Sequence, residues 1–437
     1  MTRNDIDDTT AIFHPDSYVR GVPHEAFARL RQAAAAVWVE EPAVDHLAPG
    51  PGFWAVLRHA EAQVVLRTPR LFSSSRGLTQ IYDATPQLLG PLRRMMINMD
   101  PPDHGRIRGL LARSFTPRAV AMLEERIREH ADRLVAALAR RGTADFARDI
   151  AADLPLLSLA DLLGIPESDR WLMFDWSNRV IGLLDAEYNA SDAFDVANAS
   201  PMARTALRVR PQPDADGRMP DSRHPFGMAD LYAYARELGE YRRRHPGDDI
   251  MSILLQQADR VTLDEFEQVF FLFSVAGNET VRNALPGGMF ALLSHPDEYR
   301  RLRADPGLLD SAVEEMLRWW SPVTQFRRTA DADTTLGNVP IEEGDKVVVF
   351  FASANRDERV FADPDRFDIT RDPNPHLAFG HGPHFCIAAH LARTQMRAMF
   401  AAVLEQLGEV ELAGEPQRLR SNFQNGIKHL PIEWRTT

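Results

Sequence analysis

The sequence predicts a mainly α-helical protein that also contains small β-sheets. Long segments in which apolar residues recur every three or four positions, such as 117–140, are typical of helices with one buried face. Short runs of β-branched and aromatic residues, as at 53–56 and 347–350, are typical of strands. By length alone, the 437 residues could form two or three domains or one large domain.

Composition limits the class of protein and its surroundings. The net charge of -12 provides no basic field for phosphates, which excludes a general nucleic-acid binder. The single cysteine excludes an internal disulfide, a Cys-ligated iron–sulfur cluster and a Cys-rich zinc site, and it fits a reducing compartment. Residues 1–15 are expected to form a polar tail without a secretory signal, and no apolar run approaches a membrane span. We therefore expect a soluble, cytoplasmic protein.

The first helices in chain order are ordinary parts of a core. Pro23 begins an amphipathic segment that includes Phe27 and continues into 33–36. The helix 117–140 presents its apolar positions to the core, and Gly142 is expected to stop it.

Between 209 and 227 the composition changes to Pro, Asp, Arg and Gly. Such a segment buries too little apolar area to order itself strongly, so it is either an interdomain linker or a loop. We favour a long mobile loop, because both flanking segments, 171–184 and 228–243, are predicted helices. It would join them as a surface lid.

A further helix begins at Thr262, where Thr262-Leu-Asp-Glu265 is a capping box. Its apolar first half is followed by small and polar residues: Ala276, Gly277, Asn278, Glu279 and Thr280. Gly costs about 1 kcal/mol relative to Ala in mid-helix, and a threonine can turn its hydroxyl to a carbonyl one turn back. These residues indicate a local opening of the helix, with a coincidental polar surface patch as the alternative. The Pro-Gly-Gly at 286–288 is expected to kink or end the helix.

The only cysteine, Cys386, lies in a turn built from Gly380, Gly382 and Pro383, and a predicted helix follows it. At a helix N-terminus the dipole and the unpaired backbone N–H groups favour the thiolate, which readies the sulfur for metal ligation or nucleophilic attack. Free cysteines are more often small buried hydrophobes. The Gly, His and Pro residues that precede Cys386 favour chemistry over that alternative.

Glu315 and Arg318 are three residues apart on another predicted helix, so their side chains share one face. Such a pair is usually a solvated surface ion pair that contributes well under ~1 kcal/mol. Nothing in the neighbouring residues distinguishes this pair from the usual case.

Taken together and in this order, these segments resemble the cytochrome P450 haem-thiolate monooxygenases. The loop Phe379-Gly-His-Gly-Pro-His-Phe-Cys386 resembles the haem-binding loop, Ala276-Gly-Asn-Glu-Thr280 the oxygen-activation helix, and Glu315-Met-Leu-Arg318 the Glu-x-x-Arg pair. Further matches occur within 104–108, 322–330 and 355–368. The resemblance implies one domain over 1–437 with the P450 fold, a triangular prism-like helical domain with a minor β-rich region.

The resemblance implies haem b as the cofactor, with Cys386 as the axial ligand of its iron. A thiolate in that position pushes electron density onto the iron and favours O–O cleavage. Backbone amides of the loop that contains Phe379 and Gly380 would donate to the sulfur. The side chains matched to the haem propionates are His104, Arg108, Arg328 and His384. Glu315 and Arg318 match a buried network that an arginine of 355–367 would complete.

Glu279 and Thr280 match the acid–alcohol pair that delivers protons to dioxygen. Thr280 would hold a chain of water molecules, Glu279 would connect that chain to solvent, and Gly277 beside Ala276 would let the helix open to admit dioxygen. Electrons from NAD(P)H would arrive through a ferredoxin and its reductase, and we expect the protein to act as a monomer. Four arginines could form a docking patch for an acidic ferredoxin, with scattered solvated arginines as the alternative: Arg113, Arg118, Arg393 and Arg397.

A finer resemblance, carried by 276–283 and 425–428, is to bacterial members that oxidise sterols, terpenoids and methyl-branched lipids. The substrate pocket would be lined by 78–89 and by residues of three further segments: Leu272, Val275, Val323, Thr324, Phe326, Phe423 and Gln424. Most of these residues are apolar, which predicts a hydrophobic substrate of steroid, terpenoid, fatty acid or polyketide type with one or two polar anchors. The loop 209–227 lies where members of the family open to admit substrate.

Two alternatives stay open. One is a member of the family that performs desaturation, epoxidation or coupling, or that uses peroxide; the pair Glu279 and Thr280 disfavours it. The other is a metal-binding module in which zinc is held by a His/Cys set: His381, His384, Cys386 and His390. This second alternative leaves the remaining matches without an explanation.

Overall fold

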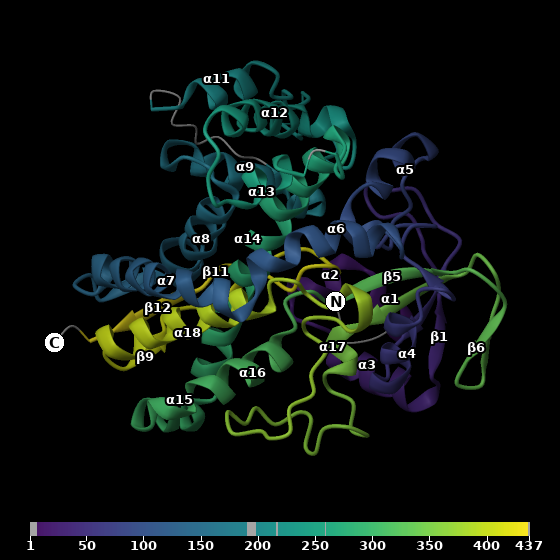
Figure 1. Cartoon of the computed structure of the whole chain (residues 1–437). Coiled ribbons are helices and arrows are strands. Elements are labelled where there is room, and N and C mark those ends of the chain that lie inside the picture. Colours follow the sequence, from purple (N-terminus) through teal and green to yellow (C-terminus); the bar gives the residue numbers. More distant parts are fainter. Residues whose placement is uncertain (1–6, 190–197, 216, 258, 436–437) are drawn as a thin grey trace.

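Helices form most of the computed structural model, which describes residues 7–189, 198–215, 217–257 and 259–435 (Figure 1). The long helices are α7 (Pro117–Leu138), α8 (Asp153–Leu163), α9 (Arg170–Ile181), α12 (Ala229–Arg244), α14 (Leu263–Ser294), α16 (Leu309–Trp320) and α18 (Ala389–Gln406). Shorter ones are α3 (His24–Ala33), α4 (His59–Arg67), α5 (Pro86–Arg93), α6 (Asp103–Leu111), α10 (Ala186–Asn189), α13 (Ile250–Leu255), α15 (Pro296–Ala304) and α17 (Phe351–Ala354). The predicted mainly α fold class is confirmed.

Helix α14 is the central element, because α8, α9, α12, α16 and α18 all pack against it. The predicted capping box is present: the Thr262 hydroxyl accepts from the Glu265 N–H, and the Glu265 carboxylate accepts from the Thr262 N–H. Of the two outcomes expected at 286–288, a kink or an end, the end is wrong, since α14 continues to Ser294. The glycines there serve packing. A Cβ on Gly287 would lie 2.2 Å from the Trp320 ring of α16.

The largest sheet joins strands from the first part of the chain, 36–73, to strands from 325–350. Its strand order is β1 (Ala36–Val39), β2 (Phe53–Val56), β8 (Lys346–Phe350), β5 (Gln325–Ala330) and β3 (Phe72–Ser73). β2 and β8, the two strands that the sequence predicts, run parallel, with Trp54 opposite Val347. Smaller sheets pair β4 (Thr143–Asp145), β12 (Pro431–Trp434) and β9 (Val410–Leu412), then β6 (Thr334–Leu336) with β7 (Val339–Ile341), and β10 (Gln417–Arg418) with β11 (Ile427–His429).

The predicted polar tail 1–15 is wrong from residue 8 onward. Helices α1 (Asp8–Phe13) and α2 (Pro15–Val19) form there, and the Asp7 carboxylate accepts from the Thr9 N–H to cap α1. Phe13 is fully buried, with its ring centroid 6.1 Å from that of Phe53 and 6.0 Å from that of Tyr82. Apolar residues spaced within an otherwise acidic segment therefore fix it to the sheet.

The segment 209–227 connects α11 (Pro201–Arg208), which sequence reasoning did not anticipate, to a short 3-10 turn (Pro225–Met228) before α12. Within it the Arg218 N–H donates to the Asp214 carboxylate over 2.9 Å. Met219 and Ser222 are buried, so part of the loop packs against the body of the protein.

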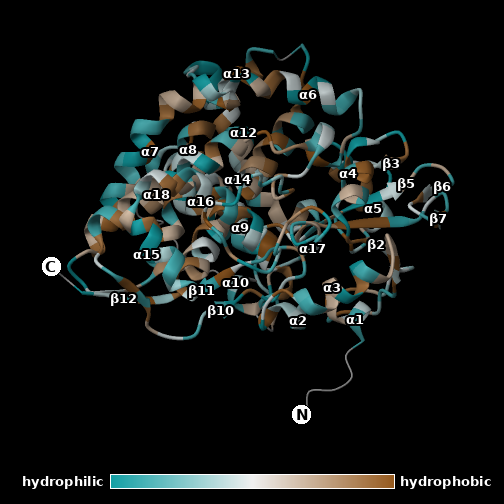
Figure 2. Cartoon of the chain, turned by 90° about the horizontal axis from the view of Figure 1, so that it is seen from below, coloured by the Kyte–Doolittle hydropathy of each residue, from teal (hydrophilic) through white to brown (hydrophobic). Residues whose placement is uncertain are grey.

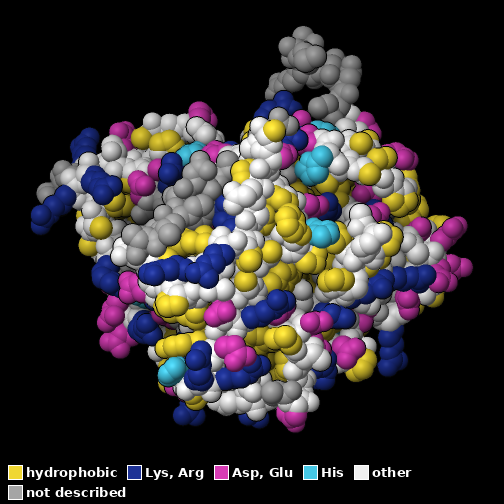
Figure 3. Space-filling view, turned by 90° about the horizontal axis from the view of Figure 1, so that it is seen from above, with side chains coloured by type: hydrophobic (Ala, Val, Ile, Leu, Met, Phe, Trp, Pro, Cys, Tyr) yellow, Lys and Arg dark blue, Asp and Glu magenta, His cyan; other side chains and the backbone are white. Residues whose placement is uncertain are grey.

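Hydropathy is distributed as the helical periodicity predicts. Hydrophobic positions face the interior and hydrophilic positions cover the outer helices, α7 among them (Figure 2). On the face seen from above, Lys and Arg side chains alternate with Asp and Glu around apolar patches (Figure 3). In the described part of the chain, no helix combines the length and the apolar character that crossing a membrane requires.

Candidate functional site

The loop before Cys386 is held in a shape that requires glycine. Gly380 and Gly382 have φ of 73° and 71°, in the left-handed region. A Cβ on Gly382 would also lie 2.5 Å from the Leu66 carbonyl oxygen. The Cys386 N–H donates to the Phe379 carbonyl over 2.9 Å, which closes the loop before α18 begins at Ala389.

The sulfur of Cys386 faces a cavity and accepts a hydrogen bond from the Ala388 N–H. Burial raises the pKa of the Cys386 thiol above its ordinary value, against the opposing effects of the Ala388 N–H and of Arg108 and Arg393. The Ala388 N–H at the helix start favours the thiolate, as expected, but burial outweighs its effect on the pKa here. A cation bound at the sulfur would supply the missing stabilisation.

This cavity lies between the Cys386 loop and α14. The α14 side is formed by Ala276, Gly277 and Thr280, and the loop side includes Phe379 and Gly380. Side chains from α6 and β5 complete it: His104, Arg108 and Arg328. The predicted cofactor residues thus come together from three separate segments around one space, and α14 forms its opposite side.

The basic side chains of the cavity have no acidic partner among the described residues. Arg328 is buried, and its Nη1 donates only to the Arg327 carbonyl over 2.7 Å; Arg108 Nη2 donates to the Phe385 carbonyl over 2.7 Å. The rings of His104 and His384 lie 4.0 Å apart. Among the described residues, none of these four side chains forms an ion pair with a carboxylate.

The lowered pKa values of these side chains also indicate that an anion is missing from the cavity. Burial and the nearby arginines lower the pKa of His104 to about 4 and that of His384 to about 2, and burial lowers the pKa of Arg328 to about 10. Arg108 and Arg328 stay charged, and buried cations without counter-charges are costly, so an anionic guest is favoured. A flat cofactor with two carboxylates and a metal that prefers thiolate fits this donor set, and haem has these features.

Thr280 and Glu279 point in different directions. Thr280 lines the cavity, with its Oγ1 donating to the Ala276 carbonyl over 3.0 Å, as the sequence suggested. Glu279 is fully buried: its Oε1 accepts from Ser177 Oγ over 2.9 Å and from Arg282 Nη1 over 2.7 Å. The predicted link from Glu279 to solvent is not present in this conformation.

Arg282 is a site residue that sequence reasoning missed. It also donates to Asn178 Oδ1 over 2.7 Å and to Tyr188 Oη over 3.0 Å, and its guanidinium lies over the Phe174 ring. The available signal was its position three residues after Glu279, which puts both side chains on one helical face.

The predicted opening of the helix at Gly277 is also absent, because α14 is continuous there. A Cβ on Gly277 would lie 3.0 Å from the side chain of Leu159 on α8. The glycine therefore permits close packing of α8 on α14 beside the cavity.

A second, mostly apolar cavity adjoins the first, and the two share residues of α14 and β5 that include Leu272, Ala276, Thr280 and Phe326. All but one of the predicted substrate residues line it: Leu272, Val275, Val323, Phe326, Phe423 and Gln424. The segment 78–89 contributes as well, for example through Leu78 and Tyr82.

Thr324 is the exception. It is fully buried outside the cavity, with its N–H donating to the Phe423 carbonyl over 2.8 Å. Neighbouring residues of an extended chain point to opposite sides, so Val323 faces the cavity and Thr324 does not. Sequence reasoning missed the contributions of the end of α9 and of the loop 209–227: Val180, Ile181, Leu183, Leu184, Ser222 and Arg223.

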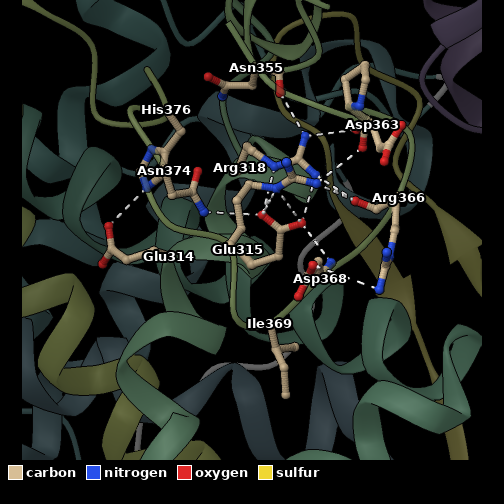
Figure 4. A network of polar contacts seen from close by, with 12 residues as sticks. Glu314, Glu315, Arg318, Asn355, Asp363, Arg366, Asp368, Ile369, Asn374 and His376 are labelled. Carbon is tan, nitrogen blue, oxygen red and sulfur yellow. Dashed lines mark hydrogen bonds and ion pairs between the residues drawn. The ribbon is translucent and has the colours of Figure 1, made fainter.

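A buried polar network supports the cysteine side of the cavity (Figure 4). Arg318 donates from Nε to Glu315 Oε2 over 2.7 Å and from Nη2 to Oε1 over 2.8 Å, and both side chains are fully buried. The third member is Arg371, whose Nε lies 3.2 Å from Glu315 Oε2. The prediction that it belongs to 355–367 is wrong, because the chain returns to Glu315 only after that segment.

The network reaches the cysteine loop through hydrogen bonds to the backbone. Arg318 Nη1 donates to the carbonyls of Asn355 and Pro364, each over 2.9 Å. Asn355 Oδ1 in turn accepts from the Leu377 N–H over 2.6 Å, two residues before Phe379. The pair therefore positions the segment that leads to Cys386.

The predicted basic patch is partly neutralised. Arg393 pairs with Glu314 over 2.6 Å and lies over the Phe379 ring, and Arg397 lies 3.4 Å from Asp310. Arg113 and Arg118 are exposed.

The fold and the site together define a haem-thiolate protein. A family model for cytochrome P450 matches residues 235–431. The chain is 36% identical over 431 residues to a Steroid C26-monooxygenase of Mycobacterium tuberculosis (strain ATCC 25618 / H37Rv), covering 96% of this chain and 91% of that protein. It is 37% identical over 417 residues to a Methyl-branched lipid omega-hydroxylase of Mycobacterium bovis, covering 94% of this chain and 90% of that protein.

A solved structure agrees. The Mycobacterium marinum cytochrome P450 CYP268A2 in complex with pseudoionone superposes with a TM-score of 0.84 at 33% identity, covering 99% of this chain and 100% of that one. The chain belongs to the cytochrome P450 family. It is accordingly a monooxygenase that uses haem b, O2 and electrons derived from NAD(P)H.

The zinc-module alternative is wrong. Across the part of the chain that the structure describes, no three His, Cys, Asp or Glu side chains are grouped so that they could hold a metal ion. His381, His384 and His390 therefore do not form a ligand set with Cys386.

Proposed function

We propose that this enzyme inserts one oxygen atom of O2 into a hydrophobic molecule of the steroid or methyl-branched lipid type. The observation that carries the proposal is the apolar second cavity, which meets the cofactor cavity at Thr280. The names of the two mycobacterial relatives support these substrate classes.

The residues of the cofactor cavity have separate tasks. Cys386 would ligate the iron, and His104, Arg108, Arg328 and His384 would bind the two carboxylates of the haem. The bound haem supplies the iron at which dioxygen is activated, and the thiolate favours O–O cleavage. The chain's own contribution on the opposite side is a hydroxyl at Thr280 Oγ1, which can hold a water molecule and pass a proton.

Glu279 would supply protons to Thr280, but only after a change of partner. In the observed conformation its Oε1 is held by Ser177 and Arg282, while Oε2 is buried without a hydrogen-bond partner among the described residues. Rotation of the carboxylate away from Arg282 would free it to meet a water molecule beside Thr280. Arg282 would then act as a positioning residue for the proton donor.

Electrons would come from a ferredoxin and its reductase, and the protein would act in the cytoplasm as a monomer. Arg113 and Arg118 are exposed and available to an acidic partner, whereas Arg393 and Arg397 would have to release Glu314 and Asp310. Exchanging Arg113 and Arg118 for Gln should weaken reduction by ferredoxin, most strongly at low ionic strength, while leaving reduction by dithionite unchanged. Equal rates at all salt concentrations would contradict this docking surface.

The loop 209–227 would act as the lid of the substrate cavity, because Ser222 and Arg223 line that cavity from within the loop. A tight-binding substrate should then protect the loop from limited proteolysis. Unchanged cleavage in the presence of substrate would contradict the lid.

A substrate screen tests the proposed reaction. The holoenzyme, with a ferredoxin and reductase, is incubated with steroids, terpenes, methyl-branched lipids and polyketides under isotopically labelled dioxygen, and the products are weighed by mass spectrometry. One labelled oxygen per product is expected. Substrate-dependent oxidation whose products carry no label would instead support desaturation or coupling, and turnover with peroxide alone would support a peroxide-driven enzyme.

A further inference from the structure

The substrate cavity contains one charged side chain among its described lining residues, Arg223. It comes from the loop 209–227, which also brings Ser222 to the cavity. A lone guanidinium in an apolar pocket would ordinarily attract a carboxylate, because Arg binds carboxylates in a bidentate manner.

Arg223, however, already forms an ion pair with Asp221. Its Nε lies 3.1 Å from both carboxylate oxygens of Asp221, its Nη2 lies 2.7 Å from Oδ2, and its backbone N–H donates to Oδ1 over 2.8 Å. Although burial alone would raise it, the pKa of Asp221 lies below its ordinary value because Arg223 donates to it. The pair stays charged and presents no net charge to the cavity.

Ser222 lies between Asp221 and Arg223, and unlike theirs its side chain is unpaired among the described residues. It is 4% exposed, and its Oγ has no hydrogen-bond partner within the described chain. Four other polar side chains of the cavity form two hydrogen-bonded pairs: Thr79 donates to Asn98 over 2.8 Å, and Asn422 donates to Tyr82 over 3.0 Å. A buried hydroxyl without a partner costs about 1–3 kcal/mol, so a bound molecule that pairs with it is favoured.

We infer that the triplet Asp221-Ser222-Arg223 selects substrates whose polar end is uncharged. The Ser222 hydroxyl, after rotation about its Cα–Cβ bond, binds the ketone or hydroxyl oxygen of the substrate, and Asp221 withholds Arg223 from carboxylates. This inference rests on the proposed function and narrows it: alcohols, sterols and ketones are substrates, and free fatty acids are excluded.

Free fatty acids are excluded because the Asp221 carboxylate already balances the charge of Arg223. A substrate carboxylate could still meet the remaining N–H donors of Arg223, but the partly buried Asp221 already balances the charge of that guanidinium and would lie close to the incoming anion. A neutral oxygen meets no such repulsion, and a hydroxyl such as that of Ser222 can both donate to it and accept from it. Selection therefore depends as much on repelling the acid as on attracting the neutral group.

Calorimetric titration of the holoenzyme tests this with a matched pair of ligands, isostearyl alcohol and isostearate. Wild-type protein is expected to bind the alcohol about tenfold more tightly than the acid. Ser222→Ala should weaken the alcohol about threefold to tenfold and leave the acid unchanged, because one hydrogen bond is lost. Asp221→Asn should tighten the acid about tenfold by freeing Arg223, with the alcohol unchanged.

Two variants serve as controls. Asp214→Asn removes a carboxylate of the same loop that does not line the cavity, and it should leave both affinities unchanged. Adding Arg223→Gln to Asp221→Asn should abolish the gain for the acid. Wild-type protein that binds the acid as tightly as the alcohol, an alcohol affinity insensitive to Ser222→Ala, or no gain in Asp221→Asn would overturn the inference.

Failure of the proposed function gives a different result. If neither isostearyl alcohol nor a steroid ketone binds or is oxidised, the lipid and steroid substrate classes are wrong. If both are oxidised but isostearate is preferred, only the neutral-end selection is wrong.

Discussion

The two sides of the cofactor cavity differ in the interactions that hold their residues in place. On the cysteine side, Glu315 and Arg318 each have several hydrogen-bond partners, both side chains and backbone groups, and the Cys386 loop has glycines at two left-handed positions. On the substrate side, the lining comes from α9, the loop 209–227 and the segment 78–89, and few of its contacts are polar. The first side has one geometry to maintain for one cofactor, whereas the second can change its residues with the substrate.

The largest effect is expected on the cysteine side. Arg318→Ala leaves the fully buried Glu315 without its main partner, which should lower the free energy of unfolding by about 3–5 kcal/mol. Urea unfolding and the haem content of the purified protein measure it. Arg300→Ala is the matched control, because Arg300 forms an exposed pair with Asp297 that should contribute less than about 1 kcal/mol. Equal losses in the two variants would remove the distinction between the buried network and the surface.

Thr280→Ala tests the substrate side at the point where the cavities meet. Loss of the hydroxyl should reduce the rate of product formation by roughly 10²-fold while haem and substrate binding persist, with NAD(P)H diverted to peroxide. Product and peroxide per NAD(P)H consumed are the quantities to measure. Thr280→Ser, which keeps a hydroxyl, should retain most of the coupling. Unchanged coupling in Thr280→Ala would remove Thr280 from proton delivery.

Acid sensitivity should come from Glu314 on the cysteine side. Despite its burial, hydrogen bonds from Arg393 and His376 lower the pKa of Glu314 to about 2. A depressed pKa in the folded state stabilises the protein above the ordinary pKa, and that stabilisation is lost as pH falls from about 4.5 toward 2. Unfolding of the wild type should therefore depend more steeply on pH in this range than unfolding of Glu314→Gln. Parallel pH profiles would contradict the assignment.

Packing around α14 gives a smaller effect that is independent of charge. Gly287→Ala places a methyl group 2.2 Å from the Trp320 ring, and overpacking of this kind costs about 1–3 kcal/mol. Gly109→Ala in α6 is the control: no heavy atom lies within 4 Å of the added Cβ, so helix propensity should stabilise it slightly. Thermal unfolding measures both. A stabilised Gly287→Ala would mean that α16 can move away from α14.

Sequence reasoning succeeded where local spacing determines structure. The α14 capping box, the strands β2 and β8 and the cysteine loop all depend on residues within a few positions of one another. Sequence reasoning failed where a contact joins segments that are far apart in the sequence. Arg371 reaches Glu315 from beyond the expected segment, and α9 brings Ser177 to Glu279 and Asn178 to Arg282 from about a hundred residues away.

The N-terminus and the loop 209–227 show a second limit. Composition suggested a polar tail and a long loop without strong packing, yet Phe13 is buried in the first, and Met219 and Ser222 are buried in the second. The average polarity of a segment does not predict whether one of its side chains is buried, because burial depends on the position of each residue.

The smallest effect is expected at Thr324. It follows Val323 in an extended segment, and of these two neighbours only Val323 lines the substrate cavity. Thr324 is fully buried, its hydroxyl has no hydrogen-bond partner in the described chain, and it does not line the cavity. Thr324→Val replaces that hydroxyl by a methyl group, so stability should change by less than about 1 kcal/mol and substrate affinity should not change. Val323→Thr places the reverse change in the cavity lining and should weaken an apolar substrate measurably in the same titration. If Thr324→Val alters affinity as much as Val323→Thr does, the alternation of facing along this segment is wrong.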